Sequence, residues 1–167
     1  EILVTRYLDH SIQVEDFGRG CPVDWNPAEQ RYNWELVFCE LYAGGKYDND
    51  NSENYEFSLG LNGLGSCATQ YASRYMDVTV WREGKEYTLH FERGEIVGKL
   101  ETREQAGSGR KTGTRIHWLP DLEVFTDIAV PLDYYQDVMK RQAVVNAGVT
   151  FRLRNEVSPG KFDTQEF

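Results

Sequence analysis

Two neighbouring segments of alternating apolar and polar residues constrain the fold most. Residues 77–82 and 85–92 both show this alternation, and Glu83-Gly84 joins them. A period of two is typical of half-buried strands, and a two-residue connection that contains glycine is typical of a hairpin. The pattern places one set of side chains on the buried face: Val78, Val80, Tyr87, Leu89 and Phe91. We therefore expect an antiparallel hairpin that contributes one face to a hydrophobic core.

The rest of the chain mixes strand and helix patterns irregularly. We expect further strands at residues 1–6, 11–14, 95–101, 114–119 and 149–154, with a loop at 102–113. We expect helices at residues 35–42, 66–76 and 131–146, with Ser66 as the N-cap of the second. Strands outnumber helices and do not alternate regularly with them. This order predicts an α+β fold, a two-layer sandwich in which a mixed sheet carries helices on one face.

Length and composition fit one domain and argue against several kinds of protein. A chain of 167 residues with 40% hydrophobic residues can bury one core. No apolar run approaches the roughly 18 residues that a membrane helix needs, so we expect no membrane partner. Cys21, Cys39 and Cys67 have no metal-ligand spacing, which indicates a reduced, cytoplasmic setting without a metal site. The net charge of −9 argues against strong DNA binding by this domain alone.

A glycine-rich run precedes the expected helix at 66–76. It reads Gly60-Leu61-Asn62-Gly63-Leu64-Gly65. Unpaired N–H groups at a helix N-terminus attract anions, and glycine lets the backbone approach a phosphate closely. The run is not a P-loop, because no Lys-Ser or Lys-Thr follows its last glycine. We expect an anion site here, and a flexible hinge is the alternative.

A second motif places a carboxylate at a glycine turn. Asp16 follows a strand pattern and opens the turn Asp16-Phe17-Gly18-Arg19-Gly20. Its carboxylate could accept a hydrogen bond from an exocyclic amine, while the glycines admit a flat ring. An aspartate that bonds to its own turn is the alternative, and the motif taken alone favours it. The Asp-Phe-Gly triplet does not indicate a protein kinase, because the chain has no His-Arg-Asp loop and no Val-Ala-Ile-Lys strand.

Two further residues could join such a ligand site. Lys46 follows Gly44-Gly45 after an expected helix, so its charge either reaches a phosphate or complements the helix dipole. Thr114 follows Gly113 on an expected strand. Its hydroxyl either lies with Asp16 along one ligand edge or simply favours the strand.

Taken together, the motifs resemble the ATPase domain of the B subunits of bacterial type II DNA topoisomerases, which are gyrase and topoisomerase IV. Residues 16–22 are similar to the family's Asp-X-Gly-Arg-Gly-Ile-Pro, and residues 41–47 to its Leu-His-Ala-Gly-Gly-Lys-Phe. Residues 60–65 are similar to Gly-Leu-His-Gly-Val-Gly, and residues 111–114 contain Thr-Gly-Thr. The resemblance covers the whole chain in order. It implies a Bergerat-type ATP-binding domain, of the gyrase, chaperone and histidine-kinase superfamily, over residues 1–167.

The resemblance also implies a role for individual residues. Asp16 would bind the adenine amine, with Thr114 assisting through water. The base would be bordered by Gly18, Gly20, Val37, Phe38 and Ile116. The phosphates of ATP would be held by Lys46 and by Gly60, Leu61, Asn62, Gly63, Leu64 and Gly65, with residues 47–59 as a lid. The mouth of the pocket, where inhibitors of this family bind, would be formed by Arg19, Pro22 and Arg82.

The chain departs from the family pattern at several points. Phe17 stands where the family usually has Asp or Asn, Cys21 replaces an isoleucine, and Asn62 replaces a histidine. An amide at Asn62 can still donate to a phosphate. The family's catalytic glutamate and its Mg²⁺-binding asparagine precede the first strand, so we expect no catalytic residue and no metal ligand in this chain. ATP and Mg²⁺ remain the expected cofactors, and the chain alone is predicted not to hydrolyse ATP.

The resemblance implies partners in a larger enzyme. These would be the rest of the longer polypeptide, a second copy of that polypeptide, the A subunits of the enzyme, and DNA bound through the full assembly. ATP binding would dimerise the B subunits, and hydrolysis would reset them during strand passage and supercoiling control. Two alternatives remain open: a module that binds a nucleotide or an inhibitor without hydrolysis, and a structural remnant whose first strand pairs with another copy.

Overall fold

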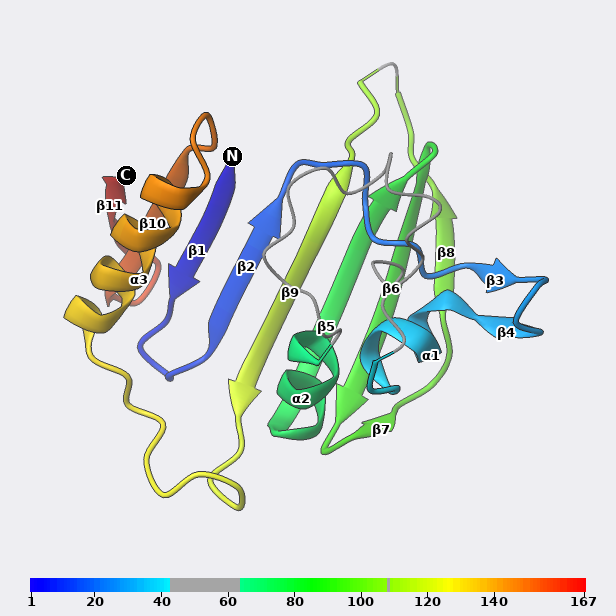
Figure 1. The fold of residues 1–167 in the computed structure, drawn as a ribbon, viewed down its shortest axis with the longest axis horizontal. Helices are drawn as coiled ribbons and strands as arrows, with labels where there is room; N and C mark the ends of the chain where they lie inside the picture. The colour runs from blue at the N-terminus through cyan, green and yellow to red at the C-terminus, as the bar shows by residue number, and fades with distance from the viewer. Residues whose placement is uncertain (43–63, 108) are drawn as a thin grey trace.

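The computed structural model describes residues 1–42, 64–107 and 109–167 (Figure 1). Within these residues, nine strands form one sheet in the order β11-β10-β1-β2-β9-β5-β6-β7, with β8 also paired to β6. In chain order, the first four strands of this sheet are β1 (Ile2–Arg6), β2 (Ile12–Asp16), β5 (Ser73–Arg82) and β6 (Lys85–Glu92). The others are β7 (Glu95–Ile96), β8 (Glu101–Glu104), β9 (Gly113–Pro120), β10 (Phe151–Ser158) and β11 (Lys161–Glu166). A separate hairpin pairs β3 (Trp25–Asn26) with β4 (Arg31–Tyr32).

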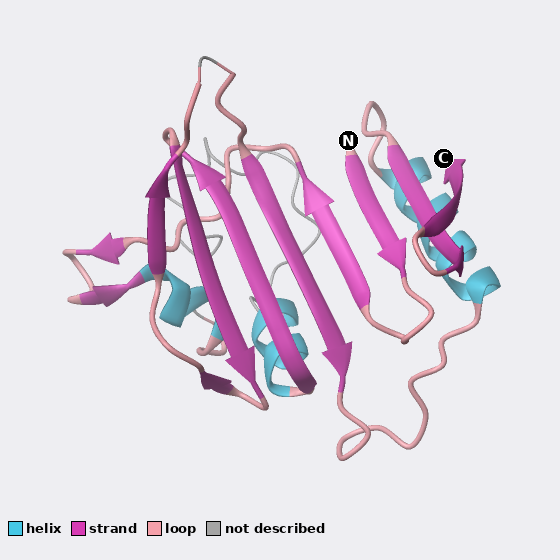
Figure 2. Ribbon diagram, turned by 180° about the vertical axis from the view of Figure 1, so that it is seen from behind, coloured by secondary structure: helices cyan, strands magenta, loops and turns pink. Residues whose placement is uncertain are grey.

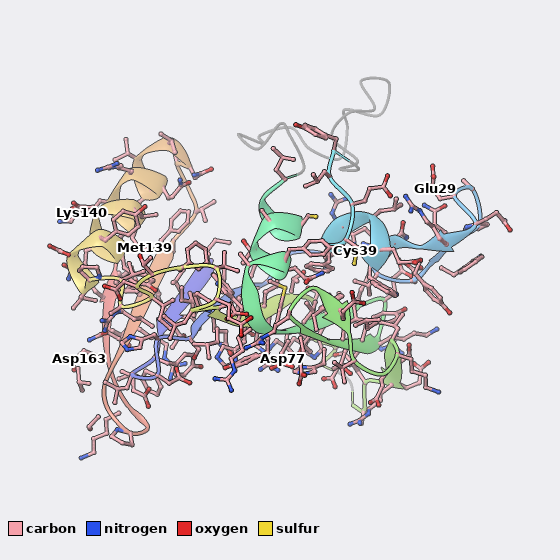
Figure 3. All side chains as sticks on the ribbon, turned by 90° about the horizontal axis from the view of Figure 1, so that it is seen from below. Glu29, Cys39, Asp77, Met139, Lys140 and Asp163 are labelled. Carbon is pink, nitrogen blue, oxygen red and sulfur yellow. The ribbon has the colours of Figure 1, made fainter. Side chains whose placement is uncertain are left out.

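Three described helices lie on the same side of the sheet. They are α1 (Asn33–Phe38), α2 (Gly65–Tyr71) and α3 (Leu132–Val145). Figure 2 shows the strands from the side that no described helix covers, and Figure 3 shows the helices above the sheet, with α3 apart from α1 and α2. The sheet is mixed, because β1 pairs with β10 in parallel and with β2 in antiparallel orientation. This arrangement confirms the expected α+β fold with helices on one face.

The core lies between the sheet and the helices and has two parts. The larger part is under α1 and α2, and its buried members are Val23, Phe38, Met76, Val78, Val80, Tyr87, Leu89 and Phe91. All five side chains that the hairpin pattern placed inward are among them, so that prediction is confirmed. The smaller part is under α3 and consists of Val4, Met139, Phe151 and Leu153.

The second helix is shorter than expected. It ends at Tyr71, and β5 begins at Ser73, so Tyr75 and Met76 are strand residues. The β-branched run that follows favours a strand, and β5 pairs on both sides, with β6 and with β9. The expected N-cap is also wrong, because the helix begins after Leu64 without a side-chain cap.

The first helix is displaced toward the N-terminus. It spans Asn33–Phe38 instead of residues 35–42. The carboxylate of Glu35 accepts a hydrogen bond from the N–H of the N-cap residue Tyr32 at 2.9 Å, so the helix starts two residues earlier than expected. The Cys39 N–H donates to the Glu35 carbonyl, and the helix ends there.

Several strands were missed or divided. The strand expected at 95–101 is two short strands, β7 and β8, and β8 occupies part of the expected loop. The hairpin β3–β4 and the edge strand β11 were not expected. In β11 every side chain except Phe162 is exposed, so the hydrophobic alternation that reveals a strand is absent there.

Candidate functional site

Asp16 and Thr114 come together on adjacent strands. Asp16 is the last residue of β2, and Thr114 is the second residue of β9. These strands are paired in antiparallel register, with Glu15 opposite Arg115. A hollow of about 490 Å³ is lined by Asp16, Arg19, Gly20, Cys21, Pro22, Arg82 and Thr114. The structure therefore brings to one hollow the carboxylate and the hydroxyl that the sequence analysis linked.

Asp16 also makes the local bond that the alternative interpretation predicted. Its Oδ1 accepts a hydrogen bond from the Gly18 N–H at 2.8 Å. An ionised carboxylate offers about four lone-pair positions, so this one bond leaves acceptor capacity for a ligand. The local bond fixes the side chain at the edge of the hollow, and the two interpretations of Asp16 are compatible.

Two glycines permit the close backbone approach that builds the hollow. Gly20 has φ +85°, and a Cβ there would lie 2.5 Å from the carbonyl oxygen of Trp81 on β5. Gly113 has φ +133°, and a Cβ there would overlap the carbonyl oxygen of Asp16. Both conformations strongly favour glycine. The expected contact of Gly20 with a base stays a prediction, and the structure adds a packing reason for the residue.

Thr114 is held by the turn that follows Asp16. Its Oγ1 accepts a hydrogen bond from the Cys21 N–H at 2.9 Å, and the residue is only 8% exposed. Burial, and secondarily the charge of Asp16, raise the pKa of the Cys21 thiol to about 12 despite the opposing effect of Arg82. Cys21 is therefore a neutral thiol at pH 7 and not an activated nucleophile. The bond from Cys21 was not expected from the sequence, since only the pairing of β2 with β9 brings the two residues together.

The three residues expected at the mouth of the pocket line the same hollow. Arg82 Nη1 donates to the Gly20 carbonyl oxygen at 3.0 Å, and Arg82 Nε lies 3.4 Å from Glu83 Oε1. A second hollow of about 560 Å³ shares Arg19 and Arg82 with the first, and its other lining residues are Phe17, Gly18, Glu83 and Thr112. The two hollows therefore adjoin at Arg19 and Arg82, one beside Asp16 and the other beside Phe17.

Other predicted site residues lie elsewhere or outside the described residues. Phe38 is fully buried in the core, and Val37 and Ile116 pack against that core; none of the three is among the described residues that line either hollow. Leu64 and Gly65 mark the start of α2. The remaining predicted phosphate-binding residues and the lid lie outside the described residues: Lys46, residues 47–59, Gly60, Leu61, Asn62 and Gly63. Their roles stay predictions.

The described residues show neither a metal centre nor a membrane helix. No group of three or more His, Cys, Asp or Glu side chains in the described ranges is arranged to hold a metal ion. None of the helices in that part of the chain is long and apolar enough to span a membrane.

The mixed sheet, its one-sided helix layer, and the Asp-X-Gly turn that meets a Gly-Thr strand define a Bergerat-type ATPase-domain fold. Two solved structures share it. One is the topoisomerase IV ATP-binding domain of Francisella tularensis in complex with a small-molecule inhibitor, with a TM-score of 0.77, 28% identity, and coverage of 99% of this chain and 42% of that chain. The other is the 43K ATPase domain of Thermus thermophilus gyrase B in complex with an aminocoumarin, with a TM-score of 0.74, 29% identity, and coverage of 98% and 39%.

The sequence comparisons agree with the fold. Among the DNA topoisomerase 4 B subunits, the chain is 39% identical over 155 residues to that of Salmonella typhimurium and 37% identical over 155 residues to that of Escherichia coli K12. These alignments cover 93% of this chain and 24% of each relative. It is 39% identical over 143 residues to the DNA gyrase B protein of Synechocystis, covering 84% of this chain and 13% of that one. No protein-family model matches. By sequence and fold, the chain is a homologue of the ATPase domains of bacterial type II topoisomerase B subunits, and it spans about a quarter of the length of the topoisomerase IV relatives.

Proposed function

We propose that this chain binds ATP, with the adenine in the hollow between Asp16 and Thr114. It would act as the ATP-binding part of one of the B subunits of a type II topoisomerase, with residues 1–167 as the ATP-binding domain and residues 47–59 as the lid. The observation that carries the proposal is the shared hollow, which joins the carboxylate of β2 to the hydroxyl of β9. The solved relatives, whose ATP-binding domains have the same fold, support it.

The polar groups of the hollow suit the edge of an adenine ring. The Asp16 carboxylate accepts hydrogen bonds, so it suits the exocyclic amine of adenine. Thr114 Oγ1 already accepts the Cys21 N–H, so its own proton is available for a ring nitrogen or a bridging water. Guanine carries a carbonyl oxygen where adenine carries the amine, and this oxygen would face a carboxylate. A polar site that is left unpaired rejects the wrong ligand strongly, so we expect selectivity for adenine.

The phosphates would extend toward Lys46 and the glycine-rich run at residues 60–65. A bound Mg²⁺ would neutralise the charge that develops during phosphoryl transfer. The described residues contain no set of ligands that fits this metal, so no step is assigned to it.

The wider role rests on the larger relatives. In a complete enzyme, we propose that ATP binding promotes the pairing of two B subunits, and that the A subunits and the bound DNA complete the strand-passage reaction in the bacterial cytoplasm. The net charge of −9 fits a domain that does not itself bind DNA strongly.

Calorimetry with a non-hydrolysable ATP analogue and its guanine counterpart tests ATP binding. The Asp16→Asn variant keeps the size of the side chain but presents an amide to the base. We expect it to weaken binding of the adenine analogue at least tenfold, or about 1.4 kcal/mol. Asp163→Asn, on the exposed edge strand β11, is the matched control and should bind like the parent chain. Equal affinity for both nucleotides, or no effect of Asp16→Asn, would contradict the proposal.

A further inference from the structure

A group of charged and aromatic side chains lies directly behind the hollow, on the face of the sheet opposite the described helices. Successive side chains of a strand point to opposite faces. Asp16 and Thr114 line the hollow, so their neighbours Glu15 and Arg115 point to the back. On β5, Val80 is in the core under the helices, so Trp81 also points to the back.

Lys111 joins two of these strands on the back face. Its Nζ lies 2.6 Å from Glu15 Oε1 on β2 and 3.6 Å from the centroid of the Trp81 ring on β5. The Glu15 side chain is only 10% exposed, and Trp81 is 6% exposed. Trp81 is fixed in turn, because its Nε1 donates to Glu86 Oε2 at 2.8 Å. One cation therefore connects β2 and β5 across the start of β9.

The backbone of Lys111 is held as firmly as its side chain. Gln105 Oε1 accepts the Lys111 N–H at 2.8 Å, and Gln105 Nε2 donates to the Lys111 carbonyl oxygen at 2.9 Å. The same Nε2 lies 3.0 Å from the Lys85 carbonyl oxygen on β6. Lys111 is thus anchored three residues before Thr114, at the point where the chain enters β9.

We propose that Lys111, through Glu15 and Trp81, is a positioning residue for adenine recognition. The ion pair and the ring contact hold residues 112–114 against the end of β2, and this fixes the distance between the Thr114 hydroxyl and the Asp16 carboxylate. The inference rests on the proposed ATP site. The alternative, that the group stabilises the fold without affecting recognition, makes different predictions.

Loss of the Lys111 charge would change the positions of β2 and β9 beside the hollow, although Lys111 itself lies on the opposite face of the sheet. Glu15 would then be a largely buried carboxylate without its partner, which proteins tolerate poorly. Arg115 is the cross-strand partner of Glu15, and its Nη2 now donates to Thr79 Oγ1 at 3.3 Å. A turn of Arg115 toward Glu15 would break that bond and draw β9 toward β2, next to Thr114. The spacing of the adenine contacts would change, while the mouth of the hollow would not.

The test compares the parent chain with Lys111→Met, Lys111→Arg, Glu15→Gln and the double variant Glu15→Gln/Lys111→Met. Calorimetry gives the affinity of each protein for the adenine and guanine analogues, and thermal unfolding shows that each is folded at the working temperature. Lys140→Met, on the exposed side of α3, is the matched control. We expect Lys111→Met to lower the preference for adenine over guanine about tenfold, and Lys111→Arg to restore most of it. The double variant should lose less than the sum of the two single losses, because its partners act as one pair.

The outcomes separate this inference from the ATP site itself. An equal loss of both nucleotides, additive single losses, or an unchanged preference in Lys111→Met would overturn the positioning role while ATP binding by the parent chain stands. Absence of ATP binding by the parent chain would overturn both. If Lys111→Met does not fold, Glu15→Gln carries the same comparison, with the same expected loss of preference.

Discussion

The two faces of the central sheet differ in what they contribute. The face under α1 and α2 carries an apolar core that continues into the hollow beside Asp16 and Thr114. The opposite face carries ion pairs and histidines, among them Lys111 with Glu15 and His90 with Asp77. Because neighbouring residues on one strand serve different faces, residues next to the site can support it without touching a ligand. If Asp16 and Thr114 bind adenine as proposed, the residues that recognise the base alternate along β2 and β9 with the residues that support them from the opposite face.

The largest expected effect comes from the core under the helices. Phe91 is fully buried and contacts the rings of Trp34 and Phe38. Phe91→Ala should lower the free energy of unfolding by about 3–5 kcal/mol, because it removes a large buried ring and leaves a cavity. Urea denaturation measures this value. Thr88→Ala, on the same strand but on the opposite face, should cost less than about 1 kcal/mol. Similar losses at both positions would show that the faces do not differ as described.

A smaller effect is expected where the backbone of β9 approaches the end of β2 closely. Gly113 has φ +133°, and a Cβ there would overlap the Asp16 carbonyl oxygen. Gly113→Ala should cost about 2–3 kcal/mol of unfolding free energy and should also weaken nucleotide binding, since β9 must move away from Asp16. Gly109→Ala is the matched control, because a Cβ there has open space around it. A neutral Gly113→Ala would contradict the close approach of the two strands.

The smallest effect concerns His90 and His117 on the sheet face that no described helix covers, called the uncovered face below. Burial lowers the pKa of His90, but hydrogen bonds to Asp77 at 2.6 Å and Glu92 at 3.2 Å outweigh it, so the pKa is raised. Burial lowers the pKa of His117. The stability that His90 contributes is therefore present below about pH 6.5 and is lost as the pH rises through the raised pKa. For His117 the sign is opposite: stability is lost as the pH falls from about 6.5 through the lowered pKa.

Urea denaturation at several pH values from about 5 to 8 measures these opposite slopes. His90→Gln should remove the loss of stability with rising pH, and His117→Gln should remove the loss with falling pH. The change in His90→Gln should stay below about 1 kcal/mol, because the His90 side chain is 37% exposed and solvent screens its ion pairs. If both substitutions changed the slope of the unfolding free energy against pH in the same direction, the assigned pKa directions would be contradicted.

The buried side chains on the face under the helices could largely be predicted from the sequence, whereas the polar contacts on the uncovered face could not. Val78, Val80 and Phe91 follow a period of two, and their burial leaves that pattern in the chain. Lys111 and Glu15 are far apart in sequence and polar, so only the pairing of β2 with β9 reveals their contact. β11 was missed for a related reason, because an exposed edge strand has no buried alternation.

The site was predictable in part for the same physical reason. Asp16 and Thr114 each lie beside glycines in a short stretch of sequence, Asp16-Phe17-Gly18 and Gly113-Thr114, so their motifs could be recognised. The bond from the Cys21 N–H to Thr114 depends on strand register and could not be recognised. The end of the second helix was also poorly predicted, since strand pairing on both sides of β5 overrides the helical pattern at Tyr75 and Met76. The third helix, expected at residues 131–146, agrees with α3 within one residue at each end.

The most direct test of the central claim is a titration of the labelled chain with a non-hydrolysable ATP analogue, followed by backbone amide shifts in NMR spectra. The account predicts saturable shifts at Gly18, Gly20, Cys21 and Thr114, whereas His90, on the uncovered face, stays unchanged. Shifts confined to the uncovered face, or no saturable shift at the hollow, would contradict the account.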